Sequence, residues 1–210
     1  MNIPIIYEDD WLLVVNKPSG LLTVPTPKKE SRTLTSILNA DLEERKIDYR
    51  LHPCHRLDRD TSGLLVYAKG KSTQKKMMDL FRARRVTKKY IAFVNGNLKN
   101  QNGRINHPLE GEYAITDYKV VNRFNDFTVV EVSPLTGRTN QIRIHFKQIG
   151  HPVLGETKYA FRKDFKIRAK RLCLHAKEIA FKHPVSQKAL RISTDMPEDL
   201  KTILKEYQYA

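Results

Sequence analysis

The stretch His55-Arg56-Leu57-Asp58-Arg59-Asp60-Thr61-Ser62-Gly63 runs directly into the apolar sequence Leu64-Leu65-Val66-Tyr67-Ala68. The apolar run predicts a buried strand, and Thr61, Ser62 and Gly63 predict a tight turn ahead of it. A carboxylate beside histidine and arginine is held ionised and can do chemistry. A turn with a solvated salt bridge explains the same residues, because most surface ion pairs are weak. From this segment alone both interpretations remain open.

Strands and helices on either side of this segment predict an α+β fold. Strands are expected at residues 5–7, 11–15, 64–69, 88–94, 114–121, 127–132, 172–181 and 189–193. Helices are expected from Thr33 to about Arg45, from Ser72 through residues 82–85, over residues 139–150 with Gly150 as the stop, and from Pro197 to Tyr207. Because most strands succeed one another directly, we expect a mixed, mostly antiparallel sheet with flanking helices and loops. The length fits a single domain over residues 1–210.

The charge of the chain favours a polyanionic partner. Lys and Arg total 38 against 23 Asp and Glu, which gives a net charge of +15. No basic stretch carries the broad aromatic face that an anionic membrane surface would bind, so nucleic acid is preferred. The densest basic run, residues 161–171, interleaves cations with Phe161, Phe165 and Ile167, which suits phosphate contact and stacking. A solvated loop face explains the same run equally well.

Composition also indicates the cellular compartment and whether a metal site is expected. No apolar run approaches the roughly 20 residues that span a bilayer, and the first residues lack a signal-peptide pattern, so we expect a cytoplasmic protein without a membrane partner. Two cysteines cannot form a disulfide framework; reduced thiols are expected, and a single bridge stays open. The set His52, Cys54, His55, Cys173 and His175 fits no familiar zinc spacing, and no metal is expected.

Five short motifs, taken in order along the chain, resemble those of the RluA-type pseudouridine synthases. They are Ile6-Tyr7-Glu8-Asp9 with Val14-Val15-Asn16-Lys17-Pro18-Ser19-Gly20-Leu21-Leu22, His55-Arg56-Leu57-Asp58 with Thr61-Ser62-Gly63, Lys89-Tyr90-Ile91-Ala92 leading to Gly96, Leu135-Thr136-Gly137-Arg138 with Gln141-Ile142-Arg143-Ile144-His145, and Gly150-His151-Pro152 with Leu154-Gly155. Any one motif is weak evidence. Five in order, over nearly the whole chain, make the resemblance specific.

The resemblance implies isomerisation of selected uridines in structured ribosomal or transfer RNA to pseudouridine, without cofactor or metal. It makes Asp58 the essential catalytic residue, which either attacks ribose carbon 1′ or removes the 2′ proton; the sequence leaves both routes open. Tyr90 is expected to stack near the target base and to help remove the proton from uracil carbon 5. Arg138 is expected to pair with Asp58 and to lower its pKa.

Four further residues are expected to support RNA binding or base flipping. Base flipping leaves a gap in the RNA, and the resemblance implies that Arg56 helps to fill it. Arg143 is expected either to contact a phosphate or to form a structural ion pair. Lys17 and Lys89 are expected to be phosphate contacts or surface charges rather than catalytic groups.

The chain departs from the family pattern in three places. Asn140 stands where many relatives have histidine, although asparagine can still donate and accept. The stretch 107–118 is shorter than usual, as if a loop or hairpin were missing. No room precedes Tyr7 for an accessory RNA-binding domain, so the catalytic domain is expected to bind RNA alone, as a monomer.

Two other classes of function compete with the synthase. A catalytically silent RNA-binding protein on the same scaffold would bind RNA and form no product. A hydrolase using Asp58 with His55 lacks a serine or cysteine nucleophile motif.

Overall fold

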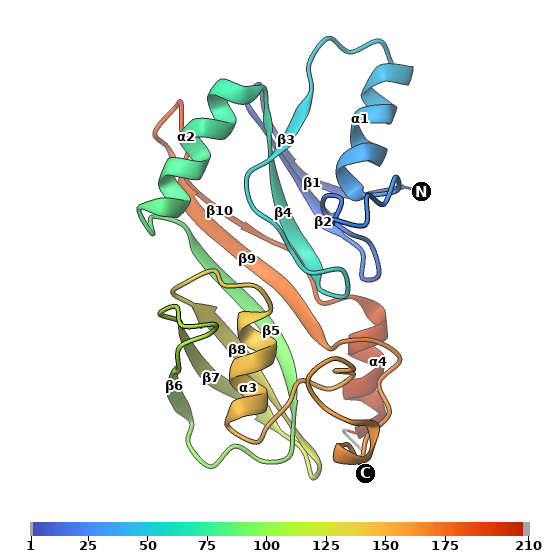
Figure 1. Ribbon diagram of the computed structural model, residues 1–210, viewed down its shortest axis with the longest axis vertical. Helices are drawn as coiled ribbons and strands as arrows, with labels where there is room; N and C mark the ends of the chain where they lie inside the picture. The colour runs from blue at the N-terminus through green and yellow to red at the C-terminus, as the bar shows by residue number, and fades with distance from the viewer. Residues whose placement is uncertain (1, 208–210) are drawn as a thin grey trace. The chain divides into compact units, whose positions relative to one another are not determined.

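The computed structural model describes residues 2–207, which form two compact units. One unit comprises residues 2–87 with Glu178–Thr194, and the other comprises Lys88–Lys177 with residues 195–207. The strands are β1 (Ile5–Glu8), β2 (Leu12–Lys17), β3 (Leu51–Pro53), β4 (Ser62–Lys69), β5 (Thr87–Asn95), β6 (Asn102–Asn106), β7 (Ile115–Arg123), β8 (Phe127–Pro134), β9 (Leu174–Lys182) and β10 (Ala189–Ser193) (Figure 1). The helices are α1 (Leu34–Glu44), α2 (Lys71–Arg82), α3 (Gln141–Gln148) and α4 (Glu198–Tyr207).

The first unit is built around β4. Antiparallel pairs join β1 to β2 and β2 to β4, β3 pairs with the end of β4, and β10 pairs with β9. Leu64 and Val66 pack into a buried cluster with Met77 of α2. On the opposite face, the hydroxyl of Tyr67 lies 3.0 Å from that of Thr35 in α1. Because helices cover both faces of β4, its sequence is a continuous apolar run rather than an alternating one.

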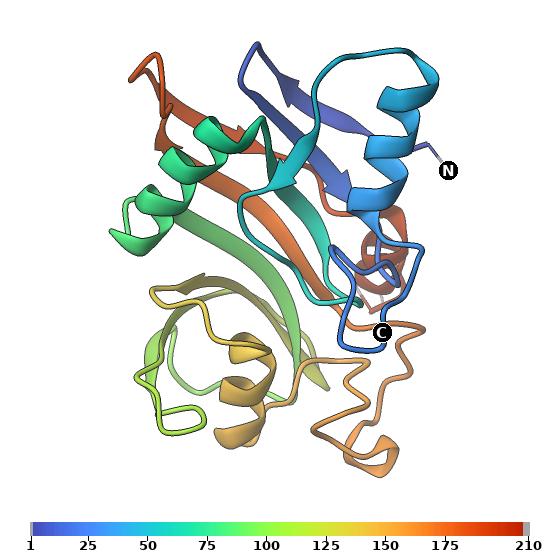
Figure 2. The same ribbon diagram turned by 45° about the horizontal axis from the view of Figure 1, so that its top comes forward.

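The second unit contains the antiparallel strands β5, β8, β7 and β6 in that order. Buried Phe93 and Phe127 pack ring against ring, with centroids 5.6 Å apart. Helix α3 lies against β7 and β8 (Figure 2), and its Phe146 packs on Tyr118 of β7 with the same centroid separation of 5.6 Å. This packing holds α3, and the motif residues on it, against the sheet.

The α+β prediction is confirmed, and most predicted elements are present to within a few residues. Thr33 caps α1 in a reciprocal capping box with Ser36, as its position predicted. The predicted cap at Ser72 is wrong, because α2 begins at Lys71 and its N-cap position is Gly70, two residues earlier. Strand β6 was not predicted, because only Ile105 in its polar sequence is buried. The single-domain assignment stays a prediction.

The stretch 107–118, which the sequence showed to be short, contains a tight turn. Leu109 and Glu112 exchange two backbone hydrogen bonds of 2.9 Å across Glu110 and Gly111. Both central residues have positive φ, 52° and 78°. This is the conformation of a two-residue hairpin turn, for which glycine at the second position is favourable.

Each unit contains one buried, free cysteine: Cys54 in the first and Cys173 in the second. Burial raises the pKa of each thiol to about 12. Among residues 2–207, no helix combines the length and the apolar character needed to cross a bilayer.

Candidate active site

Asp58 lies in a loop whose main chain is fixed by the segment 17–23. Thr23 binds Leu57 twice, since its hydroxyl donates to the Leu57 carbonyl at 3.0 Å and accepts from the Leu57 amide at 3.2 Å. On the other side of Asp58, the Gly20 amide donates to the Arg59 carbonyl at 2.9 Å, and the Ser19 hydroxyl donates to the Asp60 carbonyl at 2.7 Å. These bonds hold the backbone on both sides of the half-buried Asp58 side chain.

Lys17 is buried at the back of this loop. Its side chain is 0% exposed, and its Nζ donates to the carbonyls of Pro18, Leu21 and Arg59 at 2.9, 2.7 and 3.0 Å. A buried ammonium is tolerated when carbonyl oxygens replace its water. The prediction of a surface charge or phosphate contact is therefore wrong for Lys17, which is a structural cation of the Asp58 loop.

His55 has a structural contact of its own. Its Nε2 accepts a hydrogen bond from the amide of Val66 at 3.1 Å, and its ring packs on Phe81 with centroids 5.0 Å apart. A nitrogen that accepts this bond carries no proton. In this arrangement Nε2 of His55 is tied to the backbone of β4. Arg56, by contrast, is exposed.

Tyr90 and its two preceding lysines lie at the start of β5. Tyr90 is buried, opposite Val132 of β8. Lys89 forms an ion pair of 2.9 Å with Glu131 across the strand pair. Lys88 is half-buried with its Nζ toward Gly137, and desolvation lowers the pKa of its amine. Lys89 therefore has a structural partner.

Arg138 has a partner that the sequence did not predict. Its guanidinium forms an ion pair with Glu112, and its Nε donates to the carbonyl of Tyr113 at 3.2 Å. The side chain is 40% exposed. The hairpin turn 109–112 thus supplies an ion-pair partner for Arg138, and the pairing of Arg138 with Asp58 stays a prediction.

Arg143, five residues further on, is a buried and rigid cation. It donates from Nε and Nη2 to the two carboxylate oxygens of Glu156 at 2.6 and 2.7 Å, and the two side chains are 7% and 0% exposed. Desolvation raises the pKa of Glu156, but hydrogen bonds from Arg143 and from the amides of Lys158 and Tyr159 outweigh it and leave the pKa lowered. Of the two alternatives left open for Arg143, the structure shows the structural ion pair.

Asn140 makes both types of hydrogen bond that its amide allows. Its Nδ2 donates to the hydroxyl of Tyr159 at 2.8 Å, and its Oδ1 accepts from Nη1 of Arg143 at 3.0 Å. Its φ of 54° lies in the left-handed region, which asparagine tolerates better than most residues. Asparagine therefore fits this position.

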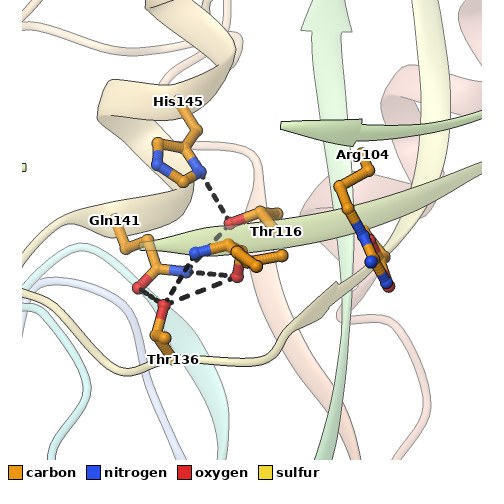
Figure 3. A network of polar contacts seen from close by, with 7 residues as sticks. Arg104, Thr116, Thr136, Gln141 and His145 are labelled. Atoms are coloured by element: carbon orange, nitrogen blue, oxygen red, sulfur yellow. Dashed lines mark hydrogen bonds and ion pairs between the residues drawn. The ribbon is translucent and has the colours of Figure 1, made fainter. Parts of the chain in front are cut away.

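A buried polar network fixes the start of α3 (Figure 3). The Oε1 of Gln141 accepts from the Thr136 hydroxyl at 2.7 Å and from the Arg138 amide at 3.0 Å. Its Nε2 donates to the Thr116 hydroxyl at 3.0 Å, and that hydroxyl lies 2.8 Å from Nδ1 of His145. The His145 Nε2 lies 3.0 Å from the carbonyl of His107, which assigns the proton to Nε2. Desolvation lowers the pKa of His145 and keeps this ring neutral.

The predicted site residues divide between the two units. Arg56, Asp58 and Lys17 belong to the first, whereas the second contains the rest, namely Tyr90, Lys89, Arg138 and Arg143. Within the first unit, Lys17 binds the loop that carries Asp58.

Sequence reasoning missed several supporting residues: Ser19, Thr23, Gln141, His145 and Glu156. All five lie inside the matched motifs or directly after one, and that position was the available signal. Thr23 follows Leu22, and Glu156 follows Gly155.

Comparison with known proteins identifies the family. Residues 11–148 match the family model for RNA pseudouridylate synthase. The chain is 36% identical to the uncharacterized RNA pseudouridine synthase YlyB of Bacillus subtilis, with 98% of this chain and 73% of that protein covered. It is also 36% identical to the dual-specificity RNA pseudouridine synthase RluA of Pasteurella multocida, with 91% and 92% covered.

Solved structures show the same fold. The human RNA pseudouridylate synthase domain containing 4 aligns with a TM-score of 0.83 at 24% identity, covering 98% of this chain and 93% of that one. The human RNA pseudouridylate synthase domain containing 1 aligns with a TM-score of 0.75 at 26% identity, covering 100% and 96%. The chain therefore belongs to the RNA pseudouridylate synthase family of isomerases.

Proposed function

We propose that the protein converts specific uridines in structured ribosomal or transfer RNA to pseudouridine, with Asp58 as the essential carboxylate. The RNA would be bound in the cytoplasm by a monomer. The target base would be flipped out of its stack, at a cost of a few kcal/mol, with Arg56 helping to fill the gap.

The observation that best supports this role for Asp58 is the fixed main chain around it. A carboxylate that attacks ribose carbon 1′ or removes the 2′ proton must be held in one geometry, because small misplacements cost large factors in rate. The hydrogen bonds from Ser19, Gly20 and Thr23 reach the carbonyls and the amide beside Asp58. These hydrogen bonds are made with the main chain on both sides of Asp58 and not with its carboxylate.

Tyr90 and an arginine are proposed to complete the chemistry. Tyr90 would contact the uracil ring and help remove the proton from carbon 5, as its place in the matched motif suggests. A fixed guanidinium would stabilise negative charge during the reaction. Arg143 suits that task better than Arg138, because Arg143 is buried and doubly bonded to Glu156, whereas Arg138 is exposed beside Glu112.

Substitution at Asp58 tests the proposal most directly. RNA carrying tritium at uracil carbon 5 is incubated with the protein, and release of tritium is measured together with RNA affinity. We expect Asp58→Asn to lower turnover by at least about 10³-fold, since the carboxylate is the reacting group, and to leave affinity within a few-fold. Asp60→Asn, in the same loop, serves as the matched control and should retain turnover.

The competing function, a silent RNA-binding protein, predicts a different result. No tritium release from any cellular RNA by folded wild-type protein would favour it and contradict the enzyme. A loss of affinity in Asp58→Asn as large as its loss of turnover would contradict the catalytic role of Asp58 instead. The paired substitutions Arg138→Lys and Arg143→Lys identify the arginine that matters, and we expect the larger loss of turnover for Arg143→Lys.

A further inference from the structure

The most basic stretch of the chain lies outside the residues proposed for the chemistry. Residues 161–171 carry six cations against the single carboxylate of Asp164. In Figure 2 the segment is the orange loop with one short turn of helix, Arg162–Asp164. We refer to residues 161–171 as the basic segment.

The backbone of the basic segment is anchored along its length. Phe165 and Ile167 are buried, and the side chain of Asn95 donates to the carbonyl of Asp164 at 3.0 Å. At its end, Arg171 binds Asp199 of α4 through two hydrogen bonds of 2.6 and 3.0 Å. A loop anchored in this way loses little conformational freedom when a ligand binds.

The six cations fall into two groups by their contacts. Arg162 donates to the carbonyl of Phe165 at 2.9 Å, Lys166 pairs with Asp126 at 2.9 Å, and Arg171 pairs with Asp199. The other three, Lys163, Arg168 and Lys170, are exposed. Within the described residues, no acidic side chain forms an ion pair with any of these three. The carboxylates thus hold the segment in place and leave three cations for an external anion.

An exposed aromatic ring begins the segment. Phe161 is 73% exposed, and the Nζ of Lys163 lies 5.8 Å from the centre of its ring. Cations that bind phosphates, next to an aromatic ring on which a base can stack, are the combination found in proteins that bind single-stranded nucleic acid. A membrane surface would require a broader apolar face than one ring.

We propose that the basic segment binds a single-stranded stretch of the substrate RNA, with Lys163, Arg168 and Lys170 on its phosphates and Phe161 stacked on a base. This inference rests on the proposed function for the identity of the RNA. It adds a contact that is made by this loop and that contributes affinity rather than chemistry.

Charge-neutralising substitutions with a matched control test the phosphate contacts. The variant K163Q/R168Q/K170Q removes three charges from the basic segment. The control K99Q/K119Q/K147Q removes three charges from exposed lysines elsewhere in the same unit. The variant K163R/R168K/K170R keeps every charge. Affinity for unfractionated transfer RNA is measured against salt concentration, and thermal melting checks that each variant is folded.

Loss of three phosphate contacts should lower the slope of log affinity against log salt by about 2, because each single-strand contact contributes about 0.7. At about 0.1 M salt this corresponds to an affinity loss on the order of 100-fold. The control and the charge-keeping variant should stay within a few-fold of wild type. Equal losses in both neutralised variants, or wild-type affinity in the first, would overturn the proposal.

Phe161 and the kinetics give independent readouts. Phe161→Leu should lower affinity by about tenfold, as loss of one stacked base does, whereas Phe161→Trp should retain it. With RNA substrate, the neutralised segment should raise KM and leave kcat at saturation unchanged, since it removes binding only. If the segment contributes to RNA affinity but the protein forms no product, the proposed function is contradicted and this inference stands. If product forms but substitutions in the segment leave RNA affinity unchanged, the proposed function stands and this inference is contradicted.

Discussion

Cations occur both behind the loop that carries Asp58 and in the basic segment, but their surroundings are opposite. Lys17 has its ammonium inside the protein, where three carbonyls surround it. Lys163, Arg168 and Lys170 are exposed, on a backbone that other residues anchor. A cation in the interior fixes a loop, whereas an exposed cation is available to a ligand.

This difference shows what net charge alone conceals. A positive total of +15 favours RNA, yet Lys17 and Arg143 contribute to it from buried positions. Substitutions of buried cations should therefore act mainly on stability, and substitutions of exposed cations mainly on RNA binding.

The largest effect on stability is expected where a buried cation loses its partner. Glu156→Gln should lower the free energy of unfolding by about 3–5 kcal/mol, because it removes the carboxylate charge that holds the buried Arg143 guanidinium through two hydrogen bonds. Glu112→Gln, the same change beside the exposed Arg138, should cost less than about 1 kcal/mol. Urea denaturation of both variants measures the difference. Equal costs would contradict the distinction between the two arginines.

Glu156 should also make the stability of the protein depend on pH. Its pKa is lowered in the folded protein, so its contribution to stability is present above its unfolded pKa of about 4.5 and is lost as the pH falls below that value. The wild type should therefore lose stability more steeply than Glu156→Gln on acidification from about pH 5 to pH 3. Parallel curves for the two proteins would argue against the ion pair.

Lys17→Met should give the next largest effect. It keeps the length of the side chain but leaves buried carbonyls without their donor, at a cost of about 2–3 kcal/mol. Turnover should fall as the Asp58 loop loosens, while RNA affinity and its salt slope stay near wild type. If Lys17 were a phosphate contact, stability would be unchanged and the salt slope would fall by about 0.7.

Two buried threonines allow a matched test of the loop itself. Thr23 bridges the amide and carbonyl of Leu57, and Thr128 bridges the amide of Leu98 and the carbonyl of Gly96 in the same manner. Each Thr→Val change should cost about 1–3 kcal/mol, since it leaves buried backbone groups unpaired. Only Thr23→Val should also lower turnover. A similar loss of turnover in Thr128→Val would show that general destabilisation is responsible.

The smallest effect on stability is expected at the exposed cations. Arg168→Gln or Lys170→Gln should change the free energy of unfolding by less than about 0.5 kcal/mol, because these side chains are on the surface. Each should nevertheless weaken RNA binding. Thermal melts beside binding curves show whether the two properties separate as expected.

Much of the fold could be predicted from the sequence because local patterns agree with it. Thr33 caps α1 by accepting a hydrogen bond from the amide of Ser36, and Gly150 follows the end of α3 with a positive φ. Strand β6 could not be predicted, because its pairing with β7 rather than its own pattern makes it a strand.

The site was predicted less completely than the fold. Motifs indicated Asp58 and Tyr90, but the contacts of Lys17, Arg138 and Arg143 depend on tertiary neighbours. The motif made Arg138 the expected partner of Asp58, but the sequence could not show that Glu112 pairs with an exposed Arg138 and that Glu156 pairs with a buried Arg143.

The two cysteines provide a way to locate these effects. A thiol with a pKa of about 12 reacts with an alkylating reagent only after its surroundings open, so the rate of labelling reports local unfolding. Cys54 and Cys173 report on different units. Peptide mass spectrometry of a partly alkylated sample thus gives two opening rates from one wild-type chain, without any introduced probe.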